Sequence, residues 1–328
     1  MENAHTIGDL LQMQSMPLDA KVLMTKARVR AWYESFDGNV YLSFSGGKDS
    51  TVLKHIIDSM YSDVPSVFVD TGLEYPEIRG FVQEVKAGQY ECFNSDVEIL
   101  RPSMRFDEVI KKYGYPVVSK EISHTVRQAR NLRPGKTKQK RLDRLNGCET
   151  KPNGEKSKYN DTRWRFLLDA PFEVSEQCCD VMKKRPAHKY EKKTGRKPIV
   201  ATMADEGMLR LQQWLRNGCN SFEGKVISKP MSFWTEQDVL QYLKRYAVPY
   251  CSVYGKIINA DELEGQLSFF QVDENLTTSG CKRTGCMYCG FGAHLDQRPN
   301  RYERMKETHP KQYDYCMRPL DQGGAGYG

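Results

Sequence analysis

The sequence lacks the long apolar runs that membrane-spanning helices need, because no run approaches roughly 18 residues. Its opening segment, MENAHTIGDL, has no basic stretch followed by an apolar one, so it does not resemble a secretory signal. The six histidines show neither HxH nor HxxxH spacing, and no internal repeat is visible. From these absences we expect a cytoplasmic protein with no membrane partner.

The composition is that of a globular protein. The 328 residues are enough for one large or two ordinary domains, and 39% apolar with 28% charged residues exclude a disordered tail or a collagen-like repeat. Ten cysteines in a reducing compartment indicate metal or redox chemistry more than disulfides. The net charge of +7 permits a polyanionic partner without requiring one.

The first half of the chain alternates between strand and helix periodicity. Strand patterns fall at 40–45, 66–71 and 97–100, and helix patterns at 52–60, 78–85 and 106–113. Strands separated by helices of this length predict an α/β fold, a parallel twisted sheet with helices on both faces. A further strand is expected at 198–203, and Thr235 with Asp238 has the spacing of a capping box that begins a helix.

The middle of the chain has a different character. Between residues 127 and 147 eight Arg and Lys side chains stand against a single carboxylate, Asp143, with Gly and Pro between them. This pattern predicts a loop or loosely ordered insertion at about 127–160.

Along the whole chain, we expect a helical lead-in at 1–37, a main domain at 38–255 and a Cys-rich C-terminal segment at 256–328. The Gly-rich end of this last segment is expected to be frayed.

The sharpest local signal is the segment SGGKDS at residues 45–50, which directly follows a predicted strand and opens a predicted helix. Glycines let several backbone N–H groups converge on a ligand, and the helix adds its positive end. Lys48 adds a mobile charge, so the segment suits a phosphate or pyrophosphate. It is not a Walker A loop, and a plain Gly-rich turn is the alternative interpretation.

This segment resembles the PP-loop of the N-type ATP pyrophosphatases, which include the phosphoadenosine phosphosulfate (PAPS) reductase family. Three further segments are similar to motifs of that family, namely DTGLEYPE at 70–77, PMSFWTEQD at 230–238 and VPY at 248–250. The resemblance runs from about residue 38 to 290. It implies an adenine nucleotide alpha hydrolase-like, Rossmann-like fold that binds ATP, or adenylyl sulfate (APS) or PAPS, with Mg²⁺.

The resemblance also implies a set of binding residues. The phosphate site would comprise Ser45, Gly46, Gly47, Lys48, Asp49 and Ser50. Asp70, followed by Thr71 and Gly72, would hold magnesium or position the ribose, with a turn cap as the alternative role. Arg210 would contact the anionic ligand with Glu206 as its weaker companion, unless Arg210 is an ordinary surface residue. Lys48, Asp70 and Arg210 are thus the expected catalytic residues.

Two pairs of cysteines form a second signal, Cys178-Cys179 and Cys286-x-x-Cys289. An adjacent pair is unusual for tetrahedral zinc, whereas neighbouring thiolates can reach different irons of one [4Fe–4S] cluster. The same CC…CxxC pattern is typical of the APS reductases in this family, where all four cysteines bind such a cluster. A zinc site, buried unligated cysteines and a three-cysteine cluster with an open iron are the alternatives.

Two more residues belong to this interpretation. Lys183 matches a family lysine near the cluster, where a cation would offset the thiolate charge. Cys281 is an alternative ligand or a sulfur-handling thiol. Cys316 follows a helical pattern, so a packing cysteine is expected there rather than a nucleophile.

The chain departs from the reductase pattern in two respects. It has no C-terminal Glu-Cys-Gly-Leu-His motif, and its glycine loop is intact where reductases usually have a degraded one. An intact loop suits ATP, so we expect adenylation of a substrate followed by sulfur transfer. The expected acceptor is a nucleic acid whose phosphate backbone contacts residues 127–144. Alternatively, residues 127–144 form a solvated loop with no such contact. A cysteine desulfurase is an expected sulfur donor, and a homo-oligomer or complex subunit the expected assembly. The alternatives are an APS or PAPS reductase and a non-catalytic nucleotide and Fe–S accessory subunit.

Overall fold

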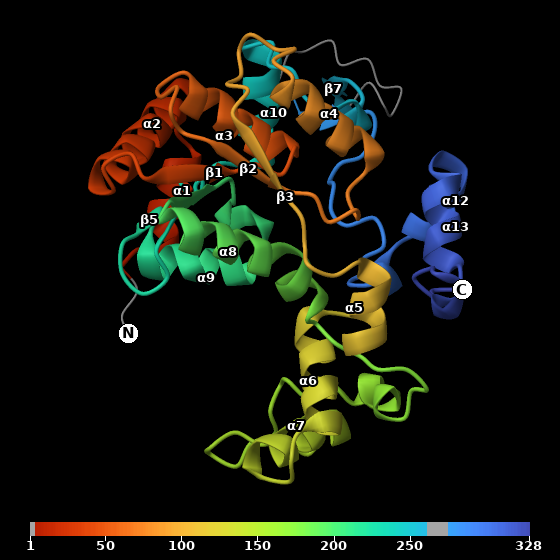
Figure 1. Ribbon diagram of the computed structural model, residues 1–328. Coiled ribbons are helices and arrows are strands. Elements are labelled where there is room, and N and C mark those ends of the chain that lie inside the picture. Colours follow the sequence, from red (N-terminus) through yellow and green to blue (C-terminus); the bar gives the residue numbers. More distant parts are fainter. Residues whose placement is uncertain (1–3, 261–274) are drawn as a thin grey trace. The chain divides into compact units, whose positions relative to one another are not determined.

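The computed structural model describes residues 4–260 and 275–328, which form two compact units (Figure 1). Unit 1 contains Met1–Asp70, Glu74–Leu100 and Ala187–Thr284. Unit 2 contains Thr71–Leu73, Arg101–Pro186 and Gly285–Gly328. Each unit therefore combines segments that are distant in the sequence. Within the described ranges no helix has the length and apolar character that a bilayer crossing requires.

Unit 1 is built on a six-stranded sheet with the order β3-β2-β1-β4-β6-β5. The strands are β1 (Val40–Ser43), β2 (Ser66–Val69), β3 (Val97–Leu100), β4 (Lys197–Val200), β5 (Asn220–Ser221) and β6 (Ile227–Ser228). All neighbouring strands pair in parallel except β5 with β6. A separate antiparallel pair joins β7 (Ile257–Asn259) to β8 (Leu276–Thr278). The predicted α/β fold with a mostly parallel sheet is confirmed.

Helices flank this sheet. They are α1 (Ile7–Gln14), α2 (Leu18–Ser35), α3 (Lys48–Asp58), α4 (Pro76–Lys86), α8 (Arg185–Thr194), α9 (Met208–Asn217) and α10 (Glu236–Arg245). Figure 1 shows α3, α4 and α10 over one face and α8 and α9 under the other. Because both faces are covered, β1 and β2 are apolar along nearly their whole length, as parallel strands usually are.

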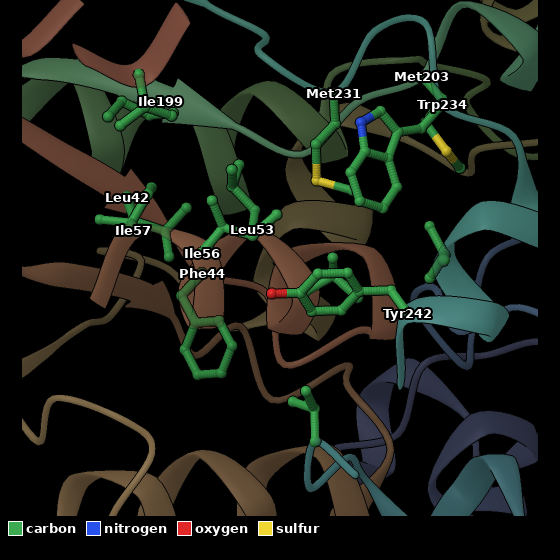
Figure 2. Packing of buried hydrophobic residues seen from close by; sticks show 14 of the residues in the cluster. Leu42, Phe44, Leu53, Ile56, Ile57, Ile199, Met203, Met231, Trp234 and Tyr242 are labelled. Carbon is green, nitrogen blue, oxygen red and sulfur yellow. The ribbon is translucent and has the colours of Figure 1, made fainter. Parts of the chain in front are cut away.

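The core of unit 1 lies between β1, α3 and α10. Leu42, Ile56 and Trp234 have no exposed surface, and Phe44 has 1% (Figure 2). Burial of each such side chain stabilises the fold by roughly 1.5–3 kcal/mol. The loop between β1 and α3 therefore connects two elements whose side chains are both buried in the core.

The capping box predicted at the start of α10 is present. Asp238 N donates to Thr235 Oγ1 at 3.3 Å, and Thr235 N donates to Asp238 Oδ2 at 2.7 Å. The strands expected at 66–71, 97–100 and 198–203 correspond to β2, β3 and β4, with β2 and β4 ending earlier than predicted.

Unit 2 is mainly helical. It contains α5 (Phe106–Tyr113), α6 (Lys120–Asn131), α7 (Lys136–Asn146), α12 (Arg301–Thr308) and α13 (Pro310–Met317), with a 3₁₀ segment at Thr162–Leu168 and a π-helical turn at Asp180–Lys184. Its core packs Val126, Leu145 and Val174, none of which is exposed, against Ile122 and Leu167.

The loop predicted at 127–160 is wrong for its first part, because α6 reaches residue 131 and α7 spans Lys136–Asn146. The many charged residues made the apolar positions of the two helices hard to recognise. These buried positions include Val126 on α6 and Leu145 on α7. Carboxylates outside the basic stretch offset its repulsion. Arg144, for example, pairs with Glu121 at 2.7 Å and donates to Asp161 at 2.6 Å.

The predicted fraying of the Gly-rich C-terminus is also wrong. Ala325 is fully buried and donates to Tyr315 O at 2.9 Å, and Tyr327 N donates to Cys316 O at 3.0 Å. A Cβ on Gly324 would lie 2.1 Å from Arg318 O, so only glycine permits this close packing. Cys316 is fully buried in α13, which confirms its prediction as a packing cysteine.

Candidate functional site

The glycine-rich loop joins β1 to α3 in unit 1, as the sequence predicted. Gly47 is the N-cap of α3, and the helix begins at Lys48. Gly46 has φ +71°, and a Cβ there would lie 2.9 Å from Val82 Cγ2 and 3.0 Å from Ile78 Cγ2. Both the left-handed backbone and the lack of space require glycine at this position. The turn therefore passes tightly over α4 and leaves the N-terminal N–H groups of α3 without helical partners.

Serine hydroxyls hold the loop in this shape. Ser50 is 4% exposed, and its Oγ donates to Gly47 O at 2.9 Å and accepts from Ser45 N at 3.2 Å. The Ser45 and Ser50 hydroxyl oxygens are also 2.9 Å apart. Ser50 thus acts mainly on the loop itself, whereas Ser45 is exposed and open to a ligand.

Lys48 is buried and already has polar partners. Its Nζ donates to Lys282 O at 2.7 Å and pairs with Glu236 Oε1 at 2.9 Å. Its backbone N–H donates to the Tyr254 hydroxyl at 3.3 Å, and that hydroxyl lies 2.6 Å from Thr284 Oγ1. Residues 282–284 therefore pack on the loop, and an anion that binds Lys48 must replace Glu236.

These groups surround a cavity of about 110 Å³, which we call the loop pocket. Its lining consists of Ser45, Gly47, Lys48, Asp49, Met203, Glu206, Glu236, Tyr254, Arg283 and Thr284. Two cations and three carboxylates thus share one small space. Such a mixed set suits a phosphate accompanied by a divalent cation better than a phosphate alone.

Asp49 contributes a carboxyl group to the loop pocket. Burial raises its pKa to about 6, with Glu206 and Glu236 adding to the rise and Lys48 and Arg283 opposing it. Its Oδ1 atom is buried and has no hydrogen-bond partner within the described residues. A buried carboxylate oxygen without a donor is the kind of ligand that Mg²⁺ takes, so this oxygen fits the expected metal.

Five other residues were expected to bind nucleotide, and only one of them, Glu206, lines the loop pocket. Glu206 lines the loop pocket and pairs with Arg210, which does not itself line the pocket. Asp70, 8% exposed at the end of β2, pairs with Arg79 at 3.0 Å and is not among the lining residues. Thr71 and Gly72 belong to unit 2.

Besides Met203, sequence reasoning missed four lining residues of the loop pocket, which are Glu236, Tyr254, Arg283 and Thr284. Glu236 stands inside the PMSFWTEQD segment, so a signal for it was present. The other three lie outside the motifs that carried the resemblance, and only folding brings them to the loop.

The four cysteines expected to act as ligands line one cavity in unit 2 together with Lys183, Met182 and Tyr288. Cys178 Sγ and Cys179 Sγ are 4.0 Å apart, immediately before the π-helical turn at Asp180–Lys184. The Cys286–Cys289 turn is closed by a hydrogen bond from Cys289 N to Cys286 O at 3.1 Å. Cys281 belongs to unit 1.

The side chain of Arg301 fixes the backbone that carries Cys289. Its Nη1 donates to Cys289 O at 2.9 Å and to Phe291 O at 3.0 Å, and Asp296 accepts from its Nε at 2.7 Å. This network orients the C-terminal half of the cysteine cavity before any ligand is bound.

The thiols of the cavity differ in acidity. A hydrogen bond from Cys178 lowers the pKa of Cys179 to about 6 despite burial, and Lys120, Lys183 and Lys184 lower it further. The same hydrogen bond, together with burial, raises the pKa of Cys178. One thiolate in a cationic setting is the usual arrangement for a metal ligand or a reactive thiol.

Four thiols line the cysteine cavity, which is the number of ligands that both a tetrahedral zinc ion and a [4Fe–4S] cluster take. Within the described residues no group of three or more Cys, His, Asp or Glu side chains is placed to hold one metal ion.

Two buried tyrosine hydroxyls in unit 2 lack hydrogen-bond partners among the described residues, those of Tyr302 and Tyr327. The ring of Tyr327 lies 3.6 Å from the position of a Cβ on Gly290, the residue after Cys289. Most buried hydroxyls in proteins have a hydrogen-bond partner, so these two are exceptions.

The fold and the loop pocket define a class of protein, a mostly parallel α/β protein with a glycine-rich turn between its first strand and the helix that follows. A family model, the phosphoadenosine phosphosulfate reductase domain, matches residues 39–147 and 136–290. The chain belongs to this family, which confirms the resemblance that its motifs carried. Proteins of the family are related to sulfonucleotide reduction and sulfur transfer.

Similar individual proteins match shorter stretches. A phosphoadenosine 5'-phosphosulfate reductase of Vibrio cholerae is 38% identical over 79 residues, 24% of this chain and 31% of that protein. An uncharacterized protein of Methanocaldococcus jannaschii is 29% identical over 122 residues, 36% of this chain and 28% of that protein. The matches therefore span about a third or less of these relatives. A solved PAPS reductase from Candida auris, in a phosphate complex, has 18% identity and a TM-score of 0.39, covering 70% of this chain and 82% of that chain.

Proposed function

We propose that the protein is an iron–sulfur enzyme that binds ATP with Mg²⁺ in the loop pocket and adenylates a substrate for sulfur transfer. The observation that carries this proposal is the intact glycine turn, with Lys48, Arg283 and the orphan oxygen of Asp49 around one cavity. Gly46 keeps this turn in its left-handed shape, in a space that would not hold a Cβ.

In the proposed reaction an unprotonated substrate oxygen, such as a carbonyl oxygen, attacks the α-phosphorus of ATP. A new P–O bond forms, the bond between the α-phosphorus and the bridging oxygen breaks, and pyrophosphate leaves with that electron pair. Lys48, once a phosphate replaces Glu236, would neutralise the developing charge together with the N–H groups in the first turn of α3. Asp49 would hold the magnesium ion that accompanies the phosphates.

The cysteine cavity would supply the sulfur chemistry. Cys178, Cys179, Cys286 and Cys289 would hold a [4Fe–4S] cluster, which when bound would carry or organise the sulfur. Lys120 and Lys183 would offset the thiolate charge, and Arg301 would keep Cys289 in place. A cysteine desulfurase is the proposed sulfur donor and a nucleic acid the proposed acceptor.

A sulfonucleotide reductase is the second candidate, favoured by the similarity to the phosphoadenosine 5'-phosphosulfate reductase of Vibrio cholerae. Its nucleophile would have to be a thiol other than Cys316, which is fully buried in α13. Cys281 is half-buried and is the thiol we assign to that role in this alternative. A third candidate, an accessory subunit that binds nucleotide without turnover, is favoured by the existing Lys48–Glu236 pair.

The three candidates predict different products. We expect anaerobically purified protein to release pyrophosphate from ATP in the presence of nucleic acid, and Lys48→Ala to lower this rate by a hundredfold or more, since removing one charge-stabilising donor costs about that much. Lys192→Ala removes an exposed lysine on α8 and is the matched control, with an unchanged rate.

The same preparation distinguishes the alternatives. Sulfite release from APS or PAPS with thioredoxin and no ATP would establish the reductase instead. Nucleotide binding with no turnover of any substrate would establish the accessory subunit. About four irons per chain are expected for a cubane, and one zinc with no iron would overturn the cluster assignment.

A further inference from the structure

The most basic part of unit 2 is formed by residues 120–168, which include α6, α7 and the 3₁₀ segment Thr162–Leu168 and which we call the basic arm. The two helices pack on each other, and the 3₁₀ segment packs against both. Between residues 127 and 165 the sequence contains thirteen Lys and Arg and only four Asp and Glu. A charge density of this kind invites a polyanion, but only cations that are not already paired can bind one.

The inner cations of the basic arm serve its own structure. Arg127 pairs with Glu176 at 2.7 Å, and Arg130 pairs with Glu173 at 3.1 Å. Arg144 is 8% exposed and is held by Asp161. The expectation that all of residues 127–144 contact a phosphate backbone therefore does not extend to these three arginines.

The outer cations are differently placed. Five of them are exposed, and none has a carboxylate within 4 Å among the residues that the structure describes. They are Arg133, Lys136, Lys156, Lys158 and Arg163. Because these side chains are not paired with a carboxylate in the described residues, they are the cations of the basic arm that can bind phosphate. They lie on its outer surface.

Aromatic rings are exposed among these cations. Tyr159 is 56% exposed and Phe166 is 61% exposed. Lys158 Nζ lies 5.2 Å from the centre of the Tyr159 ring, and Arg163 lies 5.0 Å from the centre of the Trp164 ring. Folding thus places flat apolar faces beside free positive charges, which the stretch 127–144 by itself does not contain.

We propose that the basic arm binds single-stranded nucleic acid, with the outer cations on phosphates and the Tyr159 and Phe166 rings stacked on unpaired bases. Stacking platforms flanked by cations are how proteins hold single strands without reading their sequence. A duplex would offer its phosphates but keep its bases stacked on each other, so the two rings would stay in water. The inference names the form of the polyanion and does not depend on chemistry in the loop pocket.

The test uses the full-length protein and a fluorescent 20-nucleotide single strand, as DNA and as RNA, with binding measured by anisotropy from 50 to 300 mM salt. Each phosphate neutralised on a single strand contributes about 0.7 to the salt slope, so five outer cations give a slope of about −3.5 at most. The triple variant Lys136→Ala, Lys158→Ala, Arg163→Ala should flatten the slope by about 2.

A second variant isolates stacking from charge. The double variant Tyr159→Ala, Phe166→Ala should lower affinity for the single strand by tenfold or more at one salt concentration and leave the salt slope unchanged. The matched control removes three exposed lysines from α8 in unit 1, Lys189, Lys192 and Lys193, by alanine substitution. Its affinity and slope should equal those of the unaltered protein.

Three outcomes overturn the inference: equal affinity for a duplex of the same sequence, an unchanged slope in the lysine variant, or unchanged affinity in the aromatic variant. Displacement of the strand by an equal concentration of polyglutamate would also overturn it, because only charge would then be recognised. Thermal unfolding of each variant shows whether it is folded. The binding assay contains no ATP, so a failure of adenylation and a failure of strand binding are seen separately.

Discussion

The carboxyl group of Asp49 should make the stability of the protein depend on pH in a defined window. Its pKa is raised from 3.8 to about 6 in the folded chain, mainly by burial. The folded state therefore binds a proton more tightly than the unfolded state does. Below about pH 4 both states are protonated and there is no penalty, whereas the penalty grows as pH rises and is complete above about pH 6.

The size of the penalty follows from the shift. A shift of about two pKa units corresponds to about 3 kcal/mol. Because the Asp49 side chain is only partly buried, solvent screening reduces this, and we expect about 1–2 kcal/mol at pH 8. Asp49→Asn keeps the shape and cannot ionise, so it should be more stable than the unaltered protein by that amount at pH 8 and equally stable at pH 4.

The assay is urea unfolding of both proteins in steps between pH 4 and pH 8, with Asp205→Asn, an exposed carboxylate in the same segment as Glu206, as the control. All other titrating groups are shared, so the difference in free energy of unfolding reports Asp49. A difference that is the same at every pH, or an Asp49→Asn protein less stable at pH 8, would refute the reasoning. Added Mg²⁺ should stabilise the unaltered protein and not Asp49→Asn.

Two further predictions concern the packing that supports the loop pocket. Gly46→Ala should lower the free energy of unfolding by about 1–3 kcal/mol because of its positive φ and the nearby Val82, whereas Gly80→Ala, with nothing within 4 Å, should be neutral or slightly stabilising in urea unfolding. Asp238→Ala should cost about 3–5 kcal/mol by leaving Lys21 buried without its two 2.7 Å contacts, while Asp19→Ala, at an exposed ion pair, should cost less than about 1 kcal/mol. Equal effects of the two aspartate substitutions would contradict the burial argument.

Features that depend on near neighbours in the chain were predictable. The alternation of strand and helix patterns from residue 40 to 113 produced the parallel sheet, and the glycine turn lies where its flanking patterns required. The capping box of Thr235 formed because both of its partners lie within one helical turn. The gathering of the four cysteines in one cavity was predictable only through the family pattern, since their two pairs are more than a hundred residues apart.

Features that depend on distant partners were missed. The basic stretch was expected to be irregular because its charges repel, but Glu173, Glu176 and Asp161 offset them from outside it. Tyr254 and Arg283 join the loop pocket through folds of the chain that no local spacing reveals. Likewise, Ala325 is ordered because it packs on α13, and the glycines around it give no local sign of that.

By itself the sequence determined the alternating strands and helices between residues 40 and 113, the tight turn at Gly46 and the membership in the PAPS reductase family, because periodicity, backbone sterics and short motifs act over a few residues. The tertiary structure decided which charges are free to bind. Lys48 is tied to Glu236 and Arg144 to Asp161, whereas Lys158 and Arg163 remain exposed beside aromatic rings. The sequence shows which side chains carry a charge. Whether such a side chain can bind a ligand depends on its burial and on partners that only the folded chain supplies.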